Sequence, residues 1–320
     1  MNFPNYYNSD DVGRLYLSRK SDVHNEAIRA NLKPSKTDKS KIGLFMIDNQ
    51  IDFILNANNM MGSLAVPGAM EDTVRIIEWI YRNMEQLTNI YCSLDTHRAW
   101  QIFHPTWWID ENGNHPEPFT PIIYVDIKSG KWRAVSHPLE SIEYVRKLEE
   151  DGKYVLTIWP FHTMLADIGF SMPPALFEAV LFHSIGRSAI THFESKGTHS
   201  LTEHYSVLGP EVMELNGKAI GHFNTTLFNM FNVNDYLYVA GQASLHCLMS
   251  TMDHLISKIM ATNPDLLKKI RLLVNATSPV APPPIDPLPD FLNFPEIAKR
   301  RFDDYDKMGI KLVTTFDNIG

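Results

Sequence analysis

The sequence predicts an α/β protein in which a mostly parallel, six-stranded sheet carries helices on both faces. From Lys41 onward, short β-rich runs alternate with amphipathic segments, and this alternation is typical of strand-helix-strand units. The composition agrees with a folded protein of this class, because 44% of the 320 residues are hydrophobic and 21% are charged.

Six segments are predicted to be strands because β-branched and aromatic residues are frequent in them. They are residues 42–47, 89–93, 154–158, 236–240, 270–274 and 310–314. Four segments are predicted to be helices, at 68–87, 141–150, 174–185 and 244–260. In the first of these, apolar residues recur at helical spacing from Val74 to Met84, so we expect it to cross over between the first two strands.

Three stretches extend this core. We expect a single domain over residues 41–320, preceded by an N-terminal extension at 1–40. Residues 105–133 are rich in Trp, Pro and Gly and are interpreted as an insertion, and 277–295 form a proline-rich segment. Segments of this length are more often functional lids or subunit contacts than passive linkers. The sequence leaves both roles open.

Composition and charge exclude several classes of protein. With 29 basic and 37 acidic side chains the net charge is −8, which argues against binding of nucleic acid. The longest apolar runs are shorter than the roughly 18 residues that a membrane span needs, and no signal peptide is visible. Only Cys92 and Cys247 are present, too few for a disulfide framework. We therefore expect a cytoplasmic protein without a membrane partner.

Polar side chains follow several of the predicted strands. Asp48 follows the first strand, and Asp95 and His97 follow the second; His162 comes after the third, and Cys247 lies where the fourth strand turns into a helix. Each alone has an ordinary structural explanation, as a turn cap or a small core residue. Because carboxyl ends of parallel strands meet at one edge of the sheet, we expect these side chains to lie together. At a helix start the Cys247 thiolate would be favoured.

These segments and their order resemble the isochorismatase-like cysteine hydrolases, and among them the nicotinamidases most. Each segment alone is a weak signal, whereas all of them in the same order are a specific one. The matching segments are 47–53 (Ile-Asp-Asn-Gln-Ile-Asp-Phe), 62–69 with its Gly-Ser-Leu, Asp95-Thr96-His97, Trp159-Pro160-Phe161-His162, Lys196-Gly197 with Tyr205-Ser206, and 241–247. The resemblance implies a three-layer α/β sandwich.

The resemblance also implies catalytic roles. Asp48, Lys196 and Cys247 would form a triad that attacks an amide through a thioester intermediate. The backbone N–H groups of Ala243 and Cys247 would form the oxyanion hole. The family carries a cis peptide in this turn, which would place it between Gln242 and Ala243.

The resemblance further implies a metal site and a substrate pocket. Asp95, His97 and His162 would bind one divalent ion, which we expect to be zinc or alternatively iron or manganese. Phe53, Trp159 and Tyr205 match positions that pack around the nicotinamide ring. The family commonly has a further histidine six residues after the Asp-x-His motif. Here His104 stands seven residues after His97, so its role as a ligand stays open.

Three functional hypotheses follow. The leading one is a metal-dependent nicotinamidase that acts on a small-molecule amide and forms a homo-oligomer. The second is a relative that hydrolyses another amide, a ureide or a carbamoyl compound; for such a substrate we expect Trp107, Trp108 or His115 of the insertion to fold over the pocket. The third is a catalytically idle binding homologue, which the complete triad disfavours. An isochorismatase proper is disfavoured because cleavage of a vinyl ether needs no nucleophilic cysteine.

Overall fold

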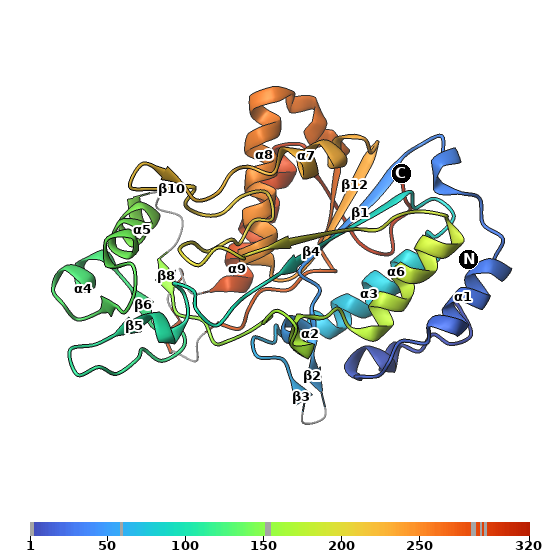
Figure 1. Cartoon of the computed structure of the whole chain (residues 1–320). Helices are drawn as coiled ribbons and strands as arrows, with labels where there is room; N and C mark the ends of the chain where they lie inside the picture. Colours follow the sequence, from blue (N-terminus) through green and yellow to red (C-terminus); the bar gives the residue numbers. More distant parts are fainter. Residues whose placement is uncertain (1–2, 58–59, 151–154, 283–285, 289, 291–292) are drawn as a thin grey trace.

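The centre of the molecule is a parallel sheet of six strands with helices on both faces, seen in a computed structural model (Figure 1). The strand order is β14-β13-β12-β1-β4-β9. The strands are β1 (Ile42–Ile47), β4 (Asn89–Asp95), β9 (His192–Lys196), β12 (Tyr236–Gly241), β13 (Ile270–Leu273) and β14 (Lys311–Val313). The structure describes all residues except 1–2, 58–59, 151–154, 283–285, 289 and 291–292. The predicted fold class is confirmed.

One predicted strand of the sheet is wrong. In the segment 154–158, whose first residue lies outside the described part of the chain, only β8 (Leu156–Thr157) is a strand. It pairs antiparallel with β6 (Pro121–Ile122), away from the main sheet. The sixth strand of the sheet is instead β9, which pairs in parallel with β4. Because β9 lies at the edge, its sequence His-Phe-Glu-Ser-Lys lacks the continuous apolar run of a buried parallel strand.

The order of the strands creates a topological switch point. Moving along the chain from β1, the next strands β4 and β9 lie on one side of β1, and β12, β13 and β14 lie on the other. Strand β1 pairs with both β4 and β12. In such sheets a crevice opens at the carboxyl ends of the strands where the direction of winding reverses, and ligands bind there.

Helices cover the two faces of the sheet (Figure 1). On one face lie α1 (Lys20–Arg29), α3 (Ala69–Arg82) and α6 (Pro174–Gly186), whose apolar side chains join one buried cluster. On the other face lie α7 (Thr225–Asn232), α8 (Met249–Thr262) and α9 (Phe294–Lys307), which contribute to a second cluster. The four predicted helices are confirmed with shifted ends, except that 244–260 begins as a π-helical turn (Ser244–Leu248) before α8. Helices α1, α7 and α9 were not predicted.

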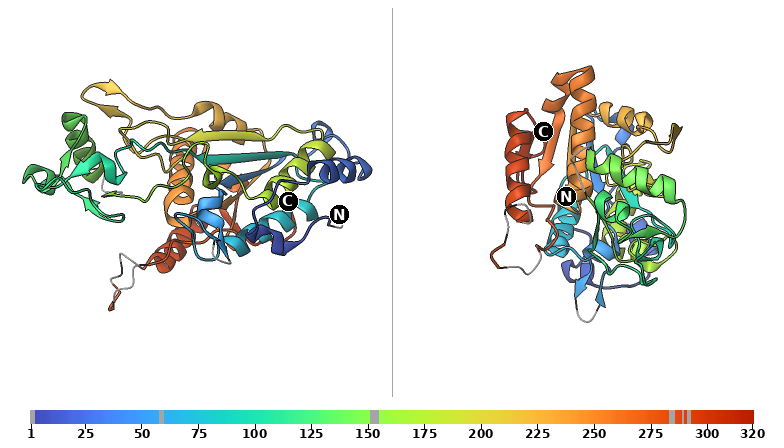
Figure 2. Two further views of the ribbon diagram at one scale, coloured as in Figure 1. Left: turned by 60° about the horizontal axis from the view of Figure 1, so that its bottom comes forward. Right: turned by 90° about the vertical axis from the view of Figure 1, so that its left-hand side faces the viewer.

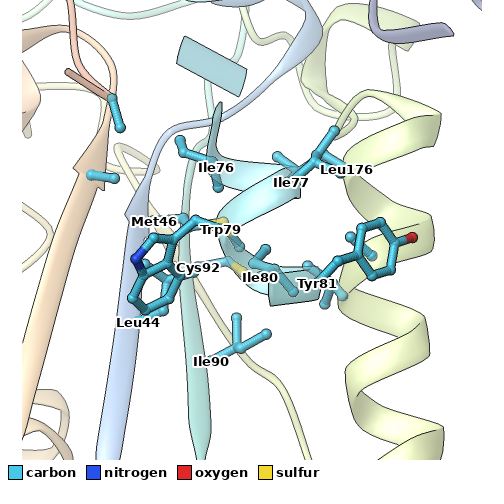
Figure 3. Close-up of a cluster of buried hydrophobic side chains, with 14 of the residues drawn as sticks. Leu44, Met46, Ile76, Ile77, Trp79, Ile80, Tyr81, Ile90, Cys92 and Leu176 are labelled. Carbon is cyan, nitrogen blue, oxygen red and sulfur yellow. The ribbon is translucent and has the colours of Figure 1, made fainter. Parts of the chain in front are cut away.

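The packing of α3 shows why its apolar spacing produces a helix on this face. Trp79 is fully buried and lies against Leu44 and Met46 of β1 (Figure 3). Its ring centroid is 4.9 Å from that of Tyr238 on β12, while Tyr81 faces Phe182 of α6 with centroids 5.7 Å apart. Burial of each such side chain contributes roughly 1.5–3 kcal/mol, so this helix holds sheet and outer helix together.

The insertion belongs to a lobe with a hydrophobic core of its own (Figure 1 and Figure 2). Trp107 and Trp108 are fully buried in this core, where their indole N–H groups donate to the Ser141 hydroxyl and the Ile102 carbonyl. A ring nitrogen of His115 lies 2.7 Å from the Trp108 carbonyl. The expectation that these side chains fold over the pocket is therefore wrong for the two tryptophans, because the lobe needs them as its core. Besides β6 and β8, the elements that contribute side chains to the core of this lobe are α4 (Tyr124–Lys128), α5 (Pro138–Glu150), β5 (Trp108–Ile109), β7 (Arg133–Ala134), β10 (Glu214–Leu215) and the 3-10 turn Pro105–Trp107.

The remaining short elements of the fold are α2 (Ile51–Ile54), β2 (Asn56–Ala57), β3 (Met60–Met61), β11 (Lys218–Ala219) and the 3-10 turns Ser9–Gly13, Ser35–Thr37, Ile168–Phe170 and Pro264–Lys269.

The N-terminal extension packs closely against α6. Arg19 forms an ion pair of 2.8 Å with the buried Glu178 of α6 and one of 3.0 Å with Asp11. The Tyr16 hydroxyl donates to the same Glu178 carboxylate. Removing one partner of a buried ion pair is costly, so these contacts fix the extension on the helix layer. Within the described residues, no helix has the length and apolar character needed to cross a membrane.

The buried His183 of α6 makes stability depend on pH. Burial, with a smaller effect of Arg187, lowers the pKa of His183 to about 4. Its Nε2 donates to the Leu87 carbonyl, and Nδ1 has no partner among the described residues. As the pH falls below about 6.5, His183 binds a proton in the unfolded chain but not in the folded protein, so stability decreases. The free energy of unfolding, measured with denaturant, should fall between pH 7 and pH 5 by about 2 kcal/mol less in His183→Gln than in wild type. Equal losses would contradict this assignment.

Candidate active site

The turn after β12 places Cys247 at the carboxyl edge of the sheet. Gly241 has φ of +118°, and a Cβ atom there would lie 2.1 Å from the Ile47 carbonyl oxygen, so only glycine fits. The next peptide bond, between Gln242 and Ala243, is cis. Cys247 lies in the π-helical turn that follows and is buried. This backbone path brings the sulfur to the switch point.

Polar contacts of the Gln242 side chain hold the same turn. Its Nε2 donates to Asp72 of α3 at 2.9 Å, and its Oε1 accepts from the Ser278 N–H at 3.2 Å. Asp72 also forms an ion pair with Arg75. Because Gln242 is fully buried, each of these bonds satisfies a group that would otherwise be desolvated without a partner. The turn is thus tied to α3 and to the segment after β13.

The ammonium group of Lys196 joins the three other groups of the site. Lys196 ends β9, and its backbone is in register with Asp95 at the end of β4. Its Nζ lies 3.0 Å from Asp48 Oδ2, 2.9 Å from Asp95 Oδ1 and 3.5 Å from Cys247 Sγ. It also donates to the His204 carbonyl at 2.9 Å. The structure therefore brings Asp48, Lys196 and Cys247 together around one buried positive charge.

The backbone and side chain of Asp48 are fixed by Ser93. Asp48 has φ of +48°, a left-handed conformation that aspartate tolerates better than most residues. Its N–H donates to Ser93 Oγ at 3.1 Å, and the Ser93 hydroxyl donates to Asp48 Oδ1 at 2.6 Å. Since Oδ1 is occupied in this way, Oδ2 is the oxygen directed at Lys196. Ser93 was not predicted from the sequence; it lies near the end of β4, the strand that pairs with β1.

Burial and neighbouring charges set the protonation of the four groups. Burial raises the pKa of Asp48, and Lys196 offsets this only in part. Burial also raises the pKa of the Cys247 thiol well above its usual range. The pKa of Asp95 is held well below its usual range because His97 and Lys196 outweigh the effect of burial. Although burial lowers the pKa of Lys196, its carboxylate partners outweigh this and keep it charged. The raised pKa of Cys247 is opposite to the expected preference for the thiolate.

Asp95, His97 and His162 form a group of potential metal ligands. One ligand atom of each lies within 4.8 Å of the others. Asp95 Oδ2 lies 2.8 Å from His97 Nε2 and 3.6 Å from His162 Nε2. The Pro160 carbonyl accepts from His162 Nδ1 at 2.7 Å, which leaves the Nε2 lone pair directed into the group, as a metal-bound histidine requires. Burial lowers the pKa of His162 to about 4, so it is neutral. This donor set fits a divalent metal ion.

His104 lies outside this group although it is close to it. Its ring centroid is 5.9 Å from that of His97 and 6.5 Å from that of His162. Its nearest aromatic neighbours are Phe103 and Phe161, with centroids 4.8 Å away in both cases. In the described part of the chain, the grouped metal donors are Asp95, His97 and His162 alone.

One pocket contains the side chains that the sequence suggested for substrate binding. Phe53, Trp159 and Tyr205 line it together with Lys196 and Cys247. Several further residues that line the pocket were not predicted to form its wall. They are Leu64, Val66, Phe103, Glu203, His204, Ala243, His246 and Val280. His246 directly precedes Cys247 in the chain, and this adjacency was the available signal for it. The contribution of Val280 depends on how the proline-rich segment folds back, which no local pattern reveals.

The fold is an α/β sandwich shared with solved nicotinamidases. The sequence itself matches no protein-family model and no curated protein. Among solved structures, the yeast nicotinamidase bound to the inhibitor nicotinaldehyde is similar with a TM-score of 0.52 at 16% identity, covering 85% of this chain and 99% of that chain. The Acinetobacter baumanii nicotinamidase gives a TM-score of 0.52 at 15% identity, covering 86% and 97%. The resemblance to nicotinamidases is thus confirmed for the fold.

Removal of the Lys196 ammonium should destabilise the fold. In Lys196→Met, the carboxylates of Asp48 and Asp95 would remain buried without their shared partner. Removing one partner of a buried ion pair typically costs about 3–5 kcal/mol. The free energy of unfolding, measured with denaturant at pH 7, should therefore be lower than in wild type by an amount of that order. In the double variant Lys196→Met/Asp48→Asn the loss should be smaller than the sum of the single losses, because the two groups interact. A loss below about 1 kcal/mol in the single variant would contradict the central role of this charge.

Changes at the predicted ligands should remove a bound divalent metal. We expect about one ion per chain in purified protein, and we expect His97→Ala and His162→Ala to lose it, since sites of this type use about three protein ligands. His104→Ala should retain the ion and serves as the matched control. Elemental analysis and titration of zinc into metal-stripped protein measure these effects. A protein that binds no divalent ion would contradict the assignment.

Proposed function

We propose that the protein is a metal-dependent cysteine amidohydrolase that converts nicotinamide and water to nicotinate and ammonia. The observation that carries this proposal is the position of Lys196 Nζ, 3.0 Å from Asp48 Oδ2 and 3.5 Å from Cys247 Sγ, inside a pocket with aromatic walls. The fold shared with two nicotinamidases supports the proposal.

In the first half of the reaction Asp48 moves a proton from the sulfur to the leaving nitrogen. Asp48 accepts the thiol proton of Cys247 as the sulfur bonds to the amide carbon. When the C–N bond breaks, the proton returns from Asp48 to nitrogen, so that neutral ammonia leaves and a thioester remains on Cys247. The raised pKa of Asp48 suits this role, because it brings the carboxyl group closer in basicity to the thiolate. Lys196 keeps its charge throughout and stabilises the anionic groups around it.

In the second half, water replaces the sulfur. Asp48, again ionised, takes a proton from a water molecule that attacks the thioester carbon, and the released thiolate regains that proton as the acid leaves. Both halves develop negative charge on the carbonyl oxygen. Ala243 and Cys247 both line the pocket, and we assign the oxyanion hole to their backbone N–H groups.

The substrate would be held between the metal ligands and the aromatic wall. Asp95, His97 and His162 would hold a divalent ion, with zinc as the first choice and iron or manganese as alternatives. When bound, the ion would supply positive charge for the pyridine nitrogen or a water molecule. Phe53, whose ring centroid is 5.6 Å from that of His162, would contact one side of the substrate ring, and Trp159 and Tyr205 the other.

Replacement of the nucleophile tests the reaction. Cys247→Ala should release ammonia from nicotinamide at least about a thousandfold more slowly than wild type, because no thioester can form. Cys92→Ala is the matched control: Cys92 is buried within β4 and its pKa is raised by burial, so this change should cost stability without abolishing turnover. Mass spectrometry should find an acyl adduct on Cys247 and none on Cys92. Activity retained in Cys247→Ala would overturn the proposal.

Substrate identity is tested separately from the reaction type. We expect ammonia release from nicotinamide and pyrazinamide to exceed that from aliphatic amides and ureides, since two aromatic walls favour a flat ring. If the wild-type protein hydrolyses a ureide but leaves millimolar nicotinamide unchanged, the triad chemistry stands and the proposed substrate is wrong.

A further inference from the structure

The carboxyl group of Glu203 is buried beside the pocket and has no part in the chemistry above. The residue is only 2% exposed and lines the pocket. Its Oε1 accepts from the Trp159 indole N–H at 2.9 Å and from the Tyr205 hydroxyl at 2.6 Å. Its Oε2 accepts from the Tyr144 hydroxyl at 3.4 Å, and that hydroxyl in turn accepts from the Glu203 N–H at 3.0 Å. One buried side chain therefore receives three donors.

These donors come from three separate parts of the fold. Trp159 follows β8, Tyr205 lies in the loop after β9, and Tyr144 belongs to α5 of the lobe. The indole Nε1 of Trp159 is also 3.1 Å from the Tyr205 hydroxyl. A buried donor left without an acceptor destabilises the folded protein, so the orientation in which both rings point their donors at Glu203 is favoured over others.

The rings of Trp159 and Tyr205, which Glu203 holds in place, form an aromatic wall that extends toward Cys247. The ring of His246 has its centroid 5.7 Å from Trp159 and 5.8 Å from Tyr205, and His246 is the residue before Cys247. On the far side of Trp159, Phe119 packs edge-on at 5.9 Å. A displacement of either wall ring would therefore be transmitted to the place where a ring substrate must lie relative to the sulfur.

We infer that Glu203 is a positioning residue that makes the site selective for flat aromatic amides, an inference that rests on the proposed function. It acts by locking the Trp159 and Tyr205 rings in one orientation against the substrate ring. A misplacement of about 1 Å between reacting atoms can cost on the order of a hundredfold in rate. A small aliphatic amide makes little use of the aromatic wall and loses less when the wall moves.

The ability to accept hydrogen bonds, and not the charge, is the property that this role needs. Burial raises the pKa of Glu203 to about 8, an effect that the donors Tyr205 and Trp159 reduce and the nearby Glu211 increases. The group is therefore largely a neutral acid at pH 7, and its carbonyl oxygen still accepts from the ring donors. A glutamine side chain offers an equivalent oxygen, which makes Glu203→Gln a conservative replacement that should restore function where Glu203→Leu does not.

The experiment compares Glu203→Leu and Glu203→Gln with wild type. For each protein, kcat and KM are measured on nicotinamide and on propionamide, and the Kd of nicotinate is measured by calorimetry. We expect Glu203→Leu to lower kcat/KM for nicotinamide about a hundredfold, with at most a threefold effect (roughly 0.7 kcal/mol) on propionamide, and to weaken nicotinate binding about tenfold. In Glu203→Gln, kcat/KM for nicotinamide and the Kd of nicotinate should both lie within about threefold of the wild-type values.

Two further variants serve as controls. Glu178→Gln removes a carboxylate that is equally buried, 1% exposed, on the distant helix α6, and should leave both substrates and nicotinate binding unchanged. Trp159→Phe keeps an aromatic ring but removes the donor, so it should reproduce the selective loss, and its effect should not add to that of Glu203→Leu. This second route tests the inference even where Glu203→Leu fails to fold.

The outcomes separate this inference from the proposed function. Equal losses of kcat/KM on both substrates, or unchanged nicotinate binding in Glu203→Leu and Trp159→Phe, would overturn the positioning role of Glu203. Turnover of nicotinamide by the wild-type protein would still support the proposed function in that case. If wild type releases no ammonia yet binds nicotinate, and Glu203→Leu weakens that binding, the proposed function fails and the role of Glu203 stands. A wild-type protein that binds no nicotinate would overturn the inference that Trp159 and Tyr205 form a wall for an aromatic ring.

Discussion

A single buried ammonium group, that of Lys196, is the interaction on which the site depends. Transfer of one charge into the protein interior is unfavourable unless opposite charges and hydrogen bonds compensate it. Here Asp48 and Asp95 lie within 3.0 Å of the nitrogen. These partners come from the ends of β1 and β4, so the charge can be buried only where parallel strands end side by side. Fold and site are therefore parts of one electrostatic arrangement.

The charges of Asp48, Asp95 and Lys196 favour the metal ion that we propose beside them. When both carboxylates are ionised and Lys196 is protonated, these groups carry a formal charge of −1, and the adjacent His162 is neutral because burial lowers its pKa to about 4. A divalent cation held by Asp95, His97 and His162 would offset this charge. Asp95 is shared between the two parts of the site, since Oδ1 faces Lys196 and Oδ2 faces His97.

The sequence predicts the interior of this fold better than its edges. Buried strands such as β1 and β12 are continuous apolar runs, and their carboxyl ends led directly to Asp48 and Cys247. Lys196 was identified through the family resemblance alone, because its edge strand has a polar sequence. Glu203 could not be found at all, since its role arises from contacts with Trp159 and Tyr144, which lie 44 and 59 positions away in the chain. Such contacts exist only once the lobe has folded.

The raised pKa of Cys247 bears on how the proposed reaction begins. Burial raises the pKa of the Cys247 thiol well above its usual range and also raises that of Asp48, the proposed proton acceptor, so Cys247 does not lose its proton readily to water. A thiolate paired with a neutral acid is therefore formed mainly when the sulfur bonds to a carbonyl carbon, which removes the anion as it appears. We propose that the rings of Trp159 and Tyr205 select which carbonyl carbon reaches the sulfur, because both rings lie against His246, the residue before Cys247. In the proposed reaction, selectivity and protection of the thiol thus have the same physical origin: a buried sulfur at the base of a pocket that a fitting amide would fill.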